Sequence, residues 1–175
     1  MIVAFITTLE QFDSNLWGHH IVVPAEFAEQ LITGRNNRRV ICRINDEVNT
    51  HSALMPSGNS WFILINKKIR EKLGLATGKR VDIQLESDKT EYGMPMPEEL
   101  SVLLDQDEEG SALFHRLTPG KQRSLIYIVS KVKNTDSRIN KALAILHHLK
   151  EQHGKVDFKR LNETIKEYNR RGRQW

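Results

Sequence analysis

Cysteine is almost absent from this sequence, and long hydrophobic runs are missing. A single cysteine, Cys42, among 175 residues excludes a disulfide framework and any zinc site built from a cluster of cysteines. Apolar runs such as Leu125 to Val129 are far too short to cross a membrane as a helix. The N-terminus also lacks the basic start and the small-residue cleavage site of a secretory signal peptide. These absences predict a soluble, cytoplasmic protein.

Positive charge is missing from one internal segment and concentrated in the next. The chain carries 26 Lys and Arg against 22 Asp and Glu, which gives a formal net charge of +4. Residues 1–90 contribute +1, residues 91–114 contribute −7, and residues 115–175 contribute +10. Such a basic segment attracts phosphates or another acidic surface. We expect part of its charge to be compensated by the nearby acidic residues Glu98, Glu99 or those at 105–109.

The first half of the chain has the residue pattern of β-strands separated by two short helices. β-Branched and aromatic residues predict strands at 2–12, 20–23, 39–44, 61–65 and 80–85. Apolar residues with helical spacing follow the predicted strand at 20–23. They also follow the strand at 61–65, where Asn66 is a suitable N-cap. Turns are expected at Thr33-Gly34 and at Asn45-Asp46.

Two stretches of this half, about 20–45 and 61–86, share the order strand, short helix, glycine turn, strand. Residues 22–31 align with residues 64–73 at an offset of 42. One such stretch cannot cover its own apolar face, but two related by a pseudo-twofold axis could interleave into a small closed barrel. The alternative is a chance similarity between two ordinary strand–helix–strand stretches.

Short residue patterns accompany the predicted strands of this half. Residues 19–24 read HHIVVP, residues 53–58 read ALMPSG, and residues 61–75 read WFILINKKIREKLGL. Over roughly residues 2–88 the sequence resembles a bacterial domain family of unknown function. The resemblance implies a double-split β-barrel of the AbrB and MazE type, which those relatives assemble from two chains. AbrB-type barrels bind DNA through exposed arginines, but that activity does not transfer automatically to a barrel fused in one chain.

The second half of the chain has the periodicity of helices. Helix starts are predicted at Pro97, at Thr118-Pro119 and at the capping residue Asp157. The strongest 3.6-residue pattern of apolar side chains lies between Ile139 and Leu149. We therefore expect a small helical domain after the barrel.

The fold class predicted for the whole chain is α+β, a pseudo-symmetric double-split β-barrel followed by a helical domain. Residues 1–90 form the barrel domain, with both halves of the barrel in one chain. Residues 91–110 form an acidic connector with a short helix, and residues 111–175 form the basic helical domain.

A second resemblance falls on the helical half. Residues 96–100 read MPEEL, and residues 114–143 read FHRLTPGKQRSLIYIVSKVKNTDSRINKAL. This pattern is similar to the bacteriocin-protection, YdeI or OmpD-associated family, whose members often carry the preceding barrel domain. The sequence departs from the family pattern at Ser130-Lys131, where Ala-Lys is usual, and around residues 135–139, which are less rich in arginine. The resemblance implies a link to antimicrobial-peptide tolerance or envelope stress and names no biochemical mechanism.

Six basic residues cluster in the sequence near the junction of two predicted helices. They are Lys121, Arg123, Lys131, Lys133, Arg138 and Lys141. The two helices superficially resemble a helix-turn-helix, in which residues such as Ser137 and Asn140 contact phosphates and base edges, although the usual turn glycine is absent. Two interpretations stay open: a polyanion-binding surface, or a solvated basic face that pairs with the acidic segment before it.

Residue patterns of catalysis and metal binding do not stand out. The seven histidines include the adjacent pairs His19-His20 and His147-His148, whose side chains point in different directions. Alternation along the predicted strand makes Cys42 a buried structural thiol rather than a nucleophile. We therefore expect no catalytic residue, no metal ion and no cofactor.

The preferred interpretation is a non-catalytic bacterial binding or stress-tolerance protein with an unidentified ligand or protein partner. A nucleic-acid-binding regulator, by analogy with AbrB-type barrels, is the second interpretation. An enzyme of unknown reaction is the third, because no nucleophile–base pair is evident.

Overall fold

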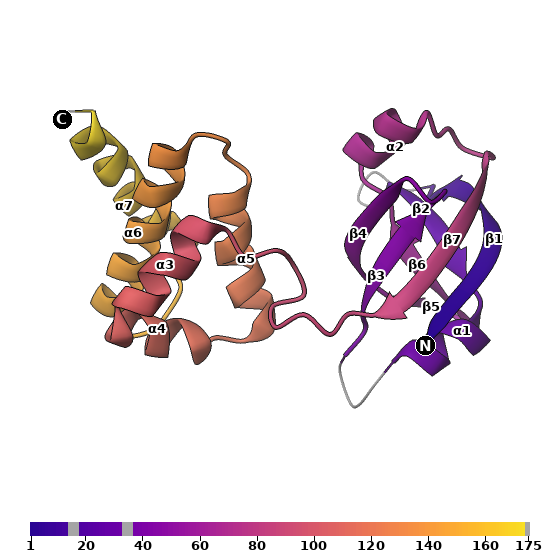
Figure 1. Ribbon diagram of the computed structural model, residues 1–175, viewed down its shortest axis with the longest axis horizontal. Helices are drawn as coiled ribbons and strands as arrows, with labels where there is room; N and C mark the ends of the chain where they lie inside the picture. The colour runs from indigo at the N-terminus through magenta and orange to yellow at the C-terminus, as the bar shows by residue number, and fades with distance from the viewer. Residues whose placement is uncertain (14–17, 33–36, 174–175) are drawn as a thin grey trace. The chain divides into compact units, whose positions relative to one another are not determined.

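The computed structural model describes residues 1–13, 18–32 and 37–173, which belong to two compact units, Met1–Gly93 (unit 1) and Met94–Trp175 (unit 2) (Figure 1). Unit 1 contains β1 (Ile2–Gln11), β2 (His19–Val23), α1 (Ala25–Leu31), β3 (Arg39–Ile44), β4 (Val48–Ala53), β5 (Met55–Ser57), β6 (Ser60–Leu64), α2 (Lys67–Leu73) and β7 (Arg80–Ser87). Unit 2 contains α3 (Glu98–Gln106), α4 (Glu108–His115), α5 (Pro119–Ser130), α6 (Thr135–Glu151) and α7 (Phe158–Gly172).

Unit 1 is built on one antiparallel sheet of seven strands in the order β4-β3-β7-β1-β2-β6-β5. The sheet curls into a half-barrel, with α1 and α2 at opposite ends of it (Figure 1). The side chains of β3 alternate between the two faces of the sheet as predicted. Val40, Cys42 and Ile44 are buried, whereas Arg39 and Ile41 are not. Strands followed by helices confirm the α+β class.

All five predicted strands are present, but β4 and β5 were not predicted. Residues 48–57 read VNTHSALMPS, in which polar residues and a proline replace the expected β-formers. Within the described chain β4 pairs only with β3, and β5 only with β6, so both lie at edges of the sheet. An edge strand is less constrained by packing and therefore shows a weaker apolar pattern.

The predicted turns and caps of unit 1 form as their residue types require. Asn45 and Asp46 both adopt positive φ angles, 51° and 56°, which asparagine and aspartate tolerate. The side chain of Asn66 accepts a hydrogen bond from Ile69 N at 2.9 Å and so begins α2. The predicted turn at Thr33-Gly34 lies outside the described residues.

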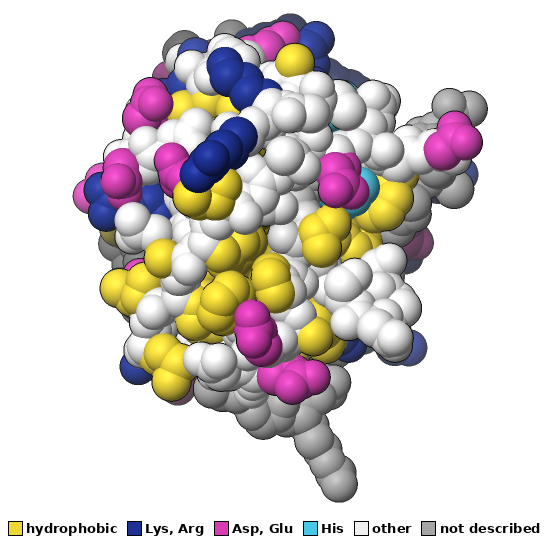
Figure 2. All heavy atoms as spheres, turned by 90° about the vertical axis from the view of Figure 1, so that its right-hand side faces the viewer, with side chains coloured by type: hydrophobic (Ala, Val, Ile, Leu, Met, Phe, Trp, Pro, Cys, Tyr) yellow, Lys and Arg dark blue, Asp and Glu magenta, His cyan; other side chains and the backbone are white. Residues whose placement is uncertain are grey.

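The sheet of unit 1 leaves apolar side chains exposed on its outer surface. Hydrophobic side chains gather on the face of this unit that is shown in Figure 2. Strand β1, at that side of Figure 1, exposes Ile2 at 63% and Ile6 at 53%. The inward-facing residues Val3 and Leu9 of the same strand are buried, so β1 contributes to the core and to the outer surface.

Helix α6 is the centre of unit 2, and the other four helices pack against it. Its buried face contains the predicted apolar residues Ala142, Leu146 and Leu149. Pro97 is the N-cap of α3 rather than its first residue, and Thr118 caps α5 as predicted. No helix in the described ranges is both long and apolar enough to span a membrane.

Helix α4 begins at Glu108 because Asp107 supplies a cap. Its carboxylate accepts a hydrogen bond from Gly110 N at 2.8 Å. A Cβ atom on Gly110 would lie 2.8 Å from Asp107 Oδ2, so a larger residue there would require the capping side chain to shift. The acidic residues of this region are therefore part of two packed helices, α3 and α4.

Candidate functional site

The six predicted polyanion-binding residues are spread over α5, the connection after it, and the first half of α6. Lys121 and Arg123 lie in the first turns of α5, and Lys131 directly follows its last residue. A helix rises about 1.5 Å per residue, so Lys121 is roughly 15 Å from Lys131 along the axis. Lys133 lies in the connection, and Arg138 and Lys141 lie on α6. The six residues thus do not form one compact cluster.

Arg138 uses its guanidinium group inside unit 2. Its Nε donates to Val132 O at 2.7 Å, and its Nη2 donates to Ser130 O at 3.5 Å. Its Nη1 lies 3.7 Å from Glu99 Oε2 on α3. The side chain therefore satisfies carbonyl groups at the C-terminal end of α5 and ties three helices together. Arg138 is a structural clamp rather than a surface cation.

Lys131 and Lys141, in contrast, form an uncompensated pair of positive charges. The pKa of Lys141 is lowered, first because partial burial removes water from its ammonium group and second because Lys131 repels it. Within the described part of the chain, neither lysine forms an ion pair with an acidic side chain. Lys131 is the C-cap of α5, and Lys141 lies nearly two turns into α6. This surface favours an anion from outside the chain.

The resemblance to a helix-turn-helix is weakened by Asn140. A Cβ atom on Gly172 of α7 would lie 2.7 Å from Asn140 Nδ2, so the Asn140 side chain lies against α7. Arg138 is also engaged inside the unit. Asn140, which was expected to contact DNA, and the basic residue Arg138 therefore both face other helices.

The expected compensation between acidic and basic residues is confirmed at two places. One is the contact of Glu99 with Arg138. The other joins Lys150 Nζ to Asp107 Oδ2 at 2.6 Å. The pKa of Asp107 is lowered, mainly by the hydrogen bond from Lys150 and next by that from Gly110 N, while the same contact with Asp107 raises the pKa of Lys150. Lys150 was not among the predicted residues because it lies far along α6.

A groove of about 290 Å³ lies beside this ion pair between α3, α6 and α7. Leu103, Leu146 and Tyr168 supply apolar walls, and Asp107 and Lys150 lie at its polar side. The charges of Asp107 and Lys150 neutralise each other. The groove therefore offers less attraction to a charged ligand than the Lys131–Lys141 pair.

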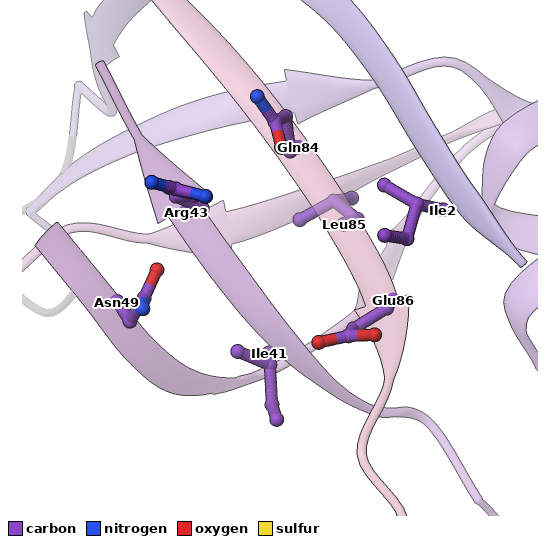
Figure 3. A pocket seen from close by; sticks show the side chains of 7 residues that line it. All are labelled: Ile2, Ile41, Arg43, Asn49, Gln84, Leu85 and Glu86. Atoms are coloured by element: carbon purple, nitrogen blue, oxygen red, sulfur yellow. The ribbon is translucent and has the colours of Figure 1, made fainter. Parts of the chain in front are cut away.

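A small depression of about 110 Å³ lies on the outer face of the sheet in unit 1. Figure 3 shows Arg43, Gln84 and Glu86 at this place, on neighbouring strands. Arg43 Nε lies 3.2 Å from Asp46 Oδ1, and Gln84 Nε2 donates to the same oxygen at 3.0 Å. Two of its polar groups are thus engaged by the neighbouring turn, which makes it a weak candidate for binding.

His51 and Asp88 form a polar pair that sequence reasoning missed. His51 Nδ1 lies 2.7 Å from Asp88 Oδ2, and the Asp88 side chain is fully buried at 0% exposure. The backbone N–H and the hydroxyl of Thr90 donate to Asp88 Oδ1 at 2.9 and 2.6 Å. Burial, the largest single effect, would raise the pKa of Asp88, but the hydrogen bonds from Thr90 and His51 together lower it. Residues 37 positions apart in sequence carry no signal for such a pair.

Cys42 is buried as predicted, and burial raises the pKa of its thiol to about 12. A thiol with such a pKa is protonated and unreactive at neutral pH. Among the residues that the structure describes, no three His, Cys, Asp or Glu side chains come together as metal ligands.

Comparison with known families assigns each half of the chain separately. Residues 93–152 match the family described as Bacteriocin-protection, YdeI or OmpD-Associated. Residues 5–85 match a Domain of unknown function (DUF1905). No curated protein matches the chain. The resemblance inferred from the helical half is thereby confirmed, and the match covers α3 to α6 but ends before α7.

Proposed function

We propose that this chain is a non-catalytic, cytoplasmic binding protein that acts in tolerance of bacteriocins, and that Lys131 and Lys141 hold an anionic partner. The match of residues 93–152 to the bacteriocin-protection family supports the role, because both lysines lie within it. The site is supported by the absence of an ion pair at either lysine in the described chain, and by the partial burial of Lys141, which together with repulsion from Lys131 lowers its pKa. Lys121, Arg123 and Lys133 would extend the surface for a longer polyanion.

The binding would be mainly electrostatic. An anion between Lys131 and Lys141 removes their mutual repulsion, and the partial burial of Lys141 strengthens the attraction because less water screens it. Arg138 positions the surface by holding the end of α5 against α6. Added salt should weaken such binding.

A survival assay tests this role. A bacteriocin-sensitive strain that expresses the chain should survive bacteriocin exposure better than a strain with empty vector. The double variant Lys131→Glu, Lys141→Glu should abolish this difference in survival. The control variant Lys155→Glu changes an exposed charge beyond the matched residues and should leave the difference unchanged. Equal survival with and without the chain would refute the protective role, and full protection by the double variant would refute the site.

A nucleic-acid-binding regulator is the second candidate, favoured by two lysines, Lys131 and Lys141, that form no ion pair in the described chain. Two phosphate contacts predict that the logarithm of the DNA association constant falls with the logarithm of salt concentration with a slope of about −2. Retention on duplex DNA at low ionic strength should show this slope and should decrease in Lys141→Glu. Absence of salt-dependent retention would eliminate the regulator.

We also propose that the half-barrel of unit 1 is a complete, AbrB-like double-split barrel made of two related halves. Two facts support this. The orders β2-α1-β3 and β6-α2-β7 are the same, and β4 at the sheet edge approaches β6. The barrel would then be complete within one chain.

A further inference from the structure

A row of alternating cationic and aromatic side chains follows one face of α5. Arg123, Tyr127 and Lys131 are spaced four residues apart, so each lies about one turn after the previous one on the same face of the helix. Lys131 is the C-cap, but its φ of −68° and ψ of −16° are still helical, so the spacing holds to the end of the row. The buried residues Leu125 and Val129 lie on another face. The three residues, which we call the α5 row, therefore lie at the surface of unit 2.

Tyr127 presents an aromatic ring to solvent in the middle of the α5 row. The residue is 60% exposed, and within the described residues its side chain makes no ring contact and no hydrogen bond. Phe158 on α7 is also exposed, at 45%, but it has Gly154 and Asn162 four residues to either side. A ring between two cations is the arrangement on which proteins stack the bases of single-stranded nucleic acids.

The cations around this ring are not compensated by acidic side chains. Lys131 is close enough to Lys141 on α6 to repel it. Arg123, Lys131 and Lys141 form no ion pair in the described chain, and Asp136, the acidic residue nearest to Lys131 in sequence, pairs with none of them. Three unpaired positive charges thus accompany one exposed ring, which suits a partner that carries both phosphates and flat apolar groups.

The geometry of the α5 row favours a single strand over a duplex. A base can stack on Tyr127 only where it is free of its neighbours in the strand, and bases inside a duplex are not. Neighbouring members of the row are about 6 Å apart along the helix axis. This spacing exceeds the rise of about 3.4 Å per nucleotide in a stacked strand. A strand that places a base on Tyr127 and phosphates on Arg123 and Lys131 is therefore extended and unstacked.

From this arrangement we infer that the anionic partner of Lys131 and Lys141 is a single-stranded nucleic acid. Its phosphates contact Arg123, Lys131 and Lys141, and one of its bases stacks on Tyr127. The inference rests on the anion site proposed above and names the class of partner. Stacking and charge do not distinguish one base from another, so binding should depend little on sequence.

Fluorescence anisotropy of the full chain with labelled oligonucleotides tests the inference. The probes are oligothymidylate and oligouridylate of about 12 nucleotides, and a DNA duplex of the same length. At least one single strand should bind about fivefold or more tightly than the duplex, although the duplex has the higher charge density. The tighter of the two single strands distinguishes DNA from RNA. If neither single strand binds, or if the duplex binds as tightly, the inference is wrong.

Variants of the α5 row separate stacking from charge. Tyr127→Leu should weaken binding of the single strand about fivefold or more, and Tyr127→Phe, which keeps the ring, should restore most of the affinity. Arg123→Gln should make the salt dependence shallower, reducing a slope of about −2 by roughly 0.7. Phe158→Leu removes an exposed ring outside the row and is the matched control. Unchanged affinity in Tyr127→Leu would overturn the inference.

Tripolyphosphate, which has no bases, distinguishes failure of this inference from failure of the proposed anion site. The double variant Lys131→Glu, Lys141→Glu should lose binding of both the single strand and tripolyphosphate, whereas Tyr127→Leu should lose only the single strand. If the wild-type chain binds tripolyphosphate through the two lysines but binds no single strand, the anion site stands and its partner is not a nucleic acid. If the double variant binds tripolyphosphate as the wild-type chain does, the anion site itself is wrong, and this inference with it.

Discussion

Arg138 and Lys141 lie one helical turn apart on α6, yet their charges have opposite roles. Arg138 is held by two carbonyl groups and Glu99, whereas Lys141 has only the repulsion of Lys131 as a charged neighbour. The sequence shows that both residues are basic, but the contacts of each depend on tertiary packing. Only a structure separates a clamp from a binding residue.

Asp107 combines two roles that substitution can separate. Asp107→Ala loses the cap of α4 and the ion pair with Lys150, and should destabilise unit 2 by about 1–2 kcal/mol. Asp107→Asn keeps a capping oxygen and loses only the partly exposed ion pair, so its cost should be within about 1 kcal/mol. Urea unfolding of the full chain measures both. Equal losses in the two variants would contradict the capping role.

His148 makes the stability of unit 2 depend on pH. Its Nε2 accepts a hydrogen bond from Asp157 N at 3.1 Å, and burial is the main cause that lowers its pKa below 6.5. The unfolded state therefore binds the proton more readily, so this stability is present above pH 6.5 and is lost as pH falls below it.

Amide hydrogen exchange in α6 and α7 should accordingly be faster at pH 5.5 than at pH 7.5, after correction for the intrinsic exchange rate. His148→Gln retains an acceptor for Asp157 N but does not titrate, so its corrected exchange should change less between the two pH values. The same pH dependence in this variant would assign the effect to another group.

At the scale of elements, helices and central strands were predictable because their signals are local. Asn66, Thr118 and Asp157 cap the helices that follow them, as their residue types indicate. The edge strands β4 and β5 were missed because their residues are polar and their pairing is set by distant segments.

The junction of α5 and α6 should depend on the clamp of Arg138. Arg138→Gln leaves carbonyl groups of residues 130 and 132 without their charged donor, and should destabilise unit 2 by about 1–3 kcal/mol. Arg123→Gln, on a residue with no ion pair in the described chain, should change stability by less than about 0.5 kcal/mol. Thermal unfolding of the full chain compares them, and equal stability of the two variants would show that Arg138 is no clamp.

At the scale of the whole molecule, charge is organised by unit. The +4 net charge includes the acidic residues of α3, of α4 and of the cap between them, and Glu99 and Asp107 pair with α6 of the same unit. The sequence predicted this compensation from the order of the charged segments. It could not predict which basic residues remain uncompensated, because that depends on which side chains the packing brings together.

The titration of the Lys141 ammonium group, followed by NMR of the full chain, tests the central claim most directly. Without a ligand, the pKa of Lys141 should lie below its usual value because of burial and Lys131, and Lys131→Gln should raise it. Tripolyphosphate should raise the same pKa in the wild-type chain and raise it less in the variant, since an anion between the lysines stabilises both charges. A pKa of Lys141 that responds neither to Lys131→Gln nor to tripolyphosphate would contradict the proposed anion site.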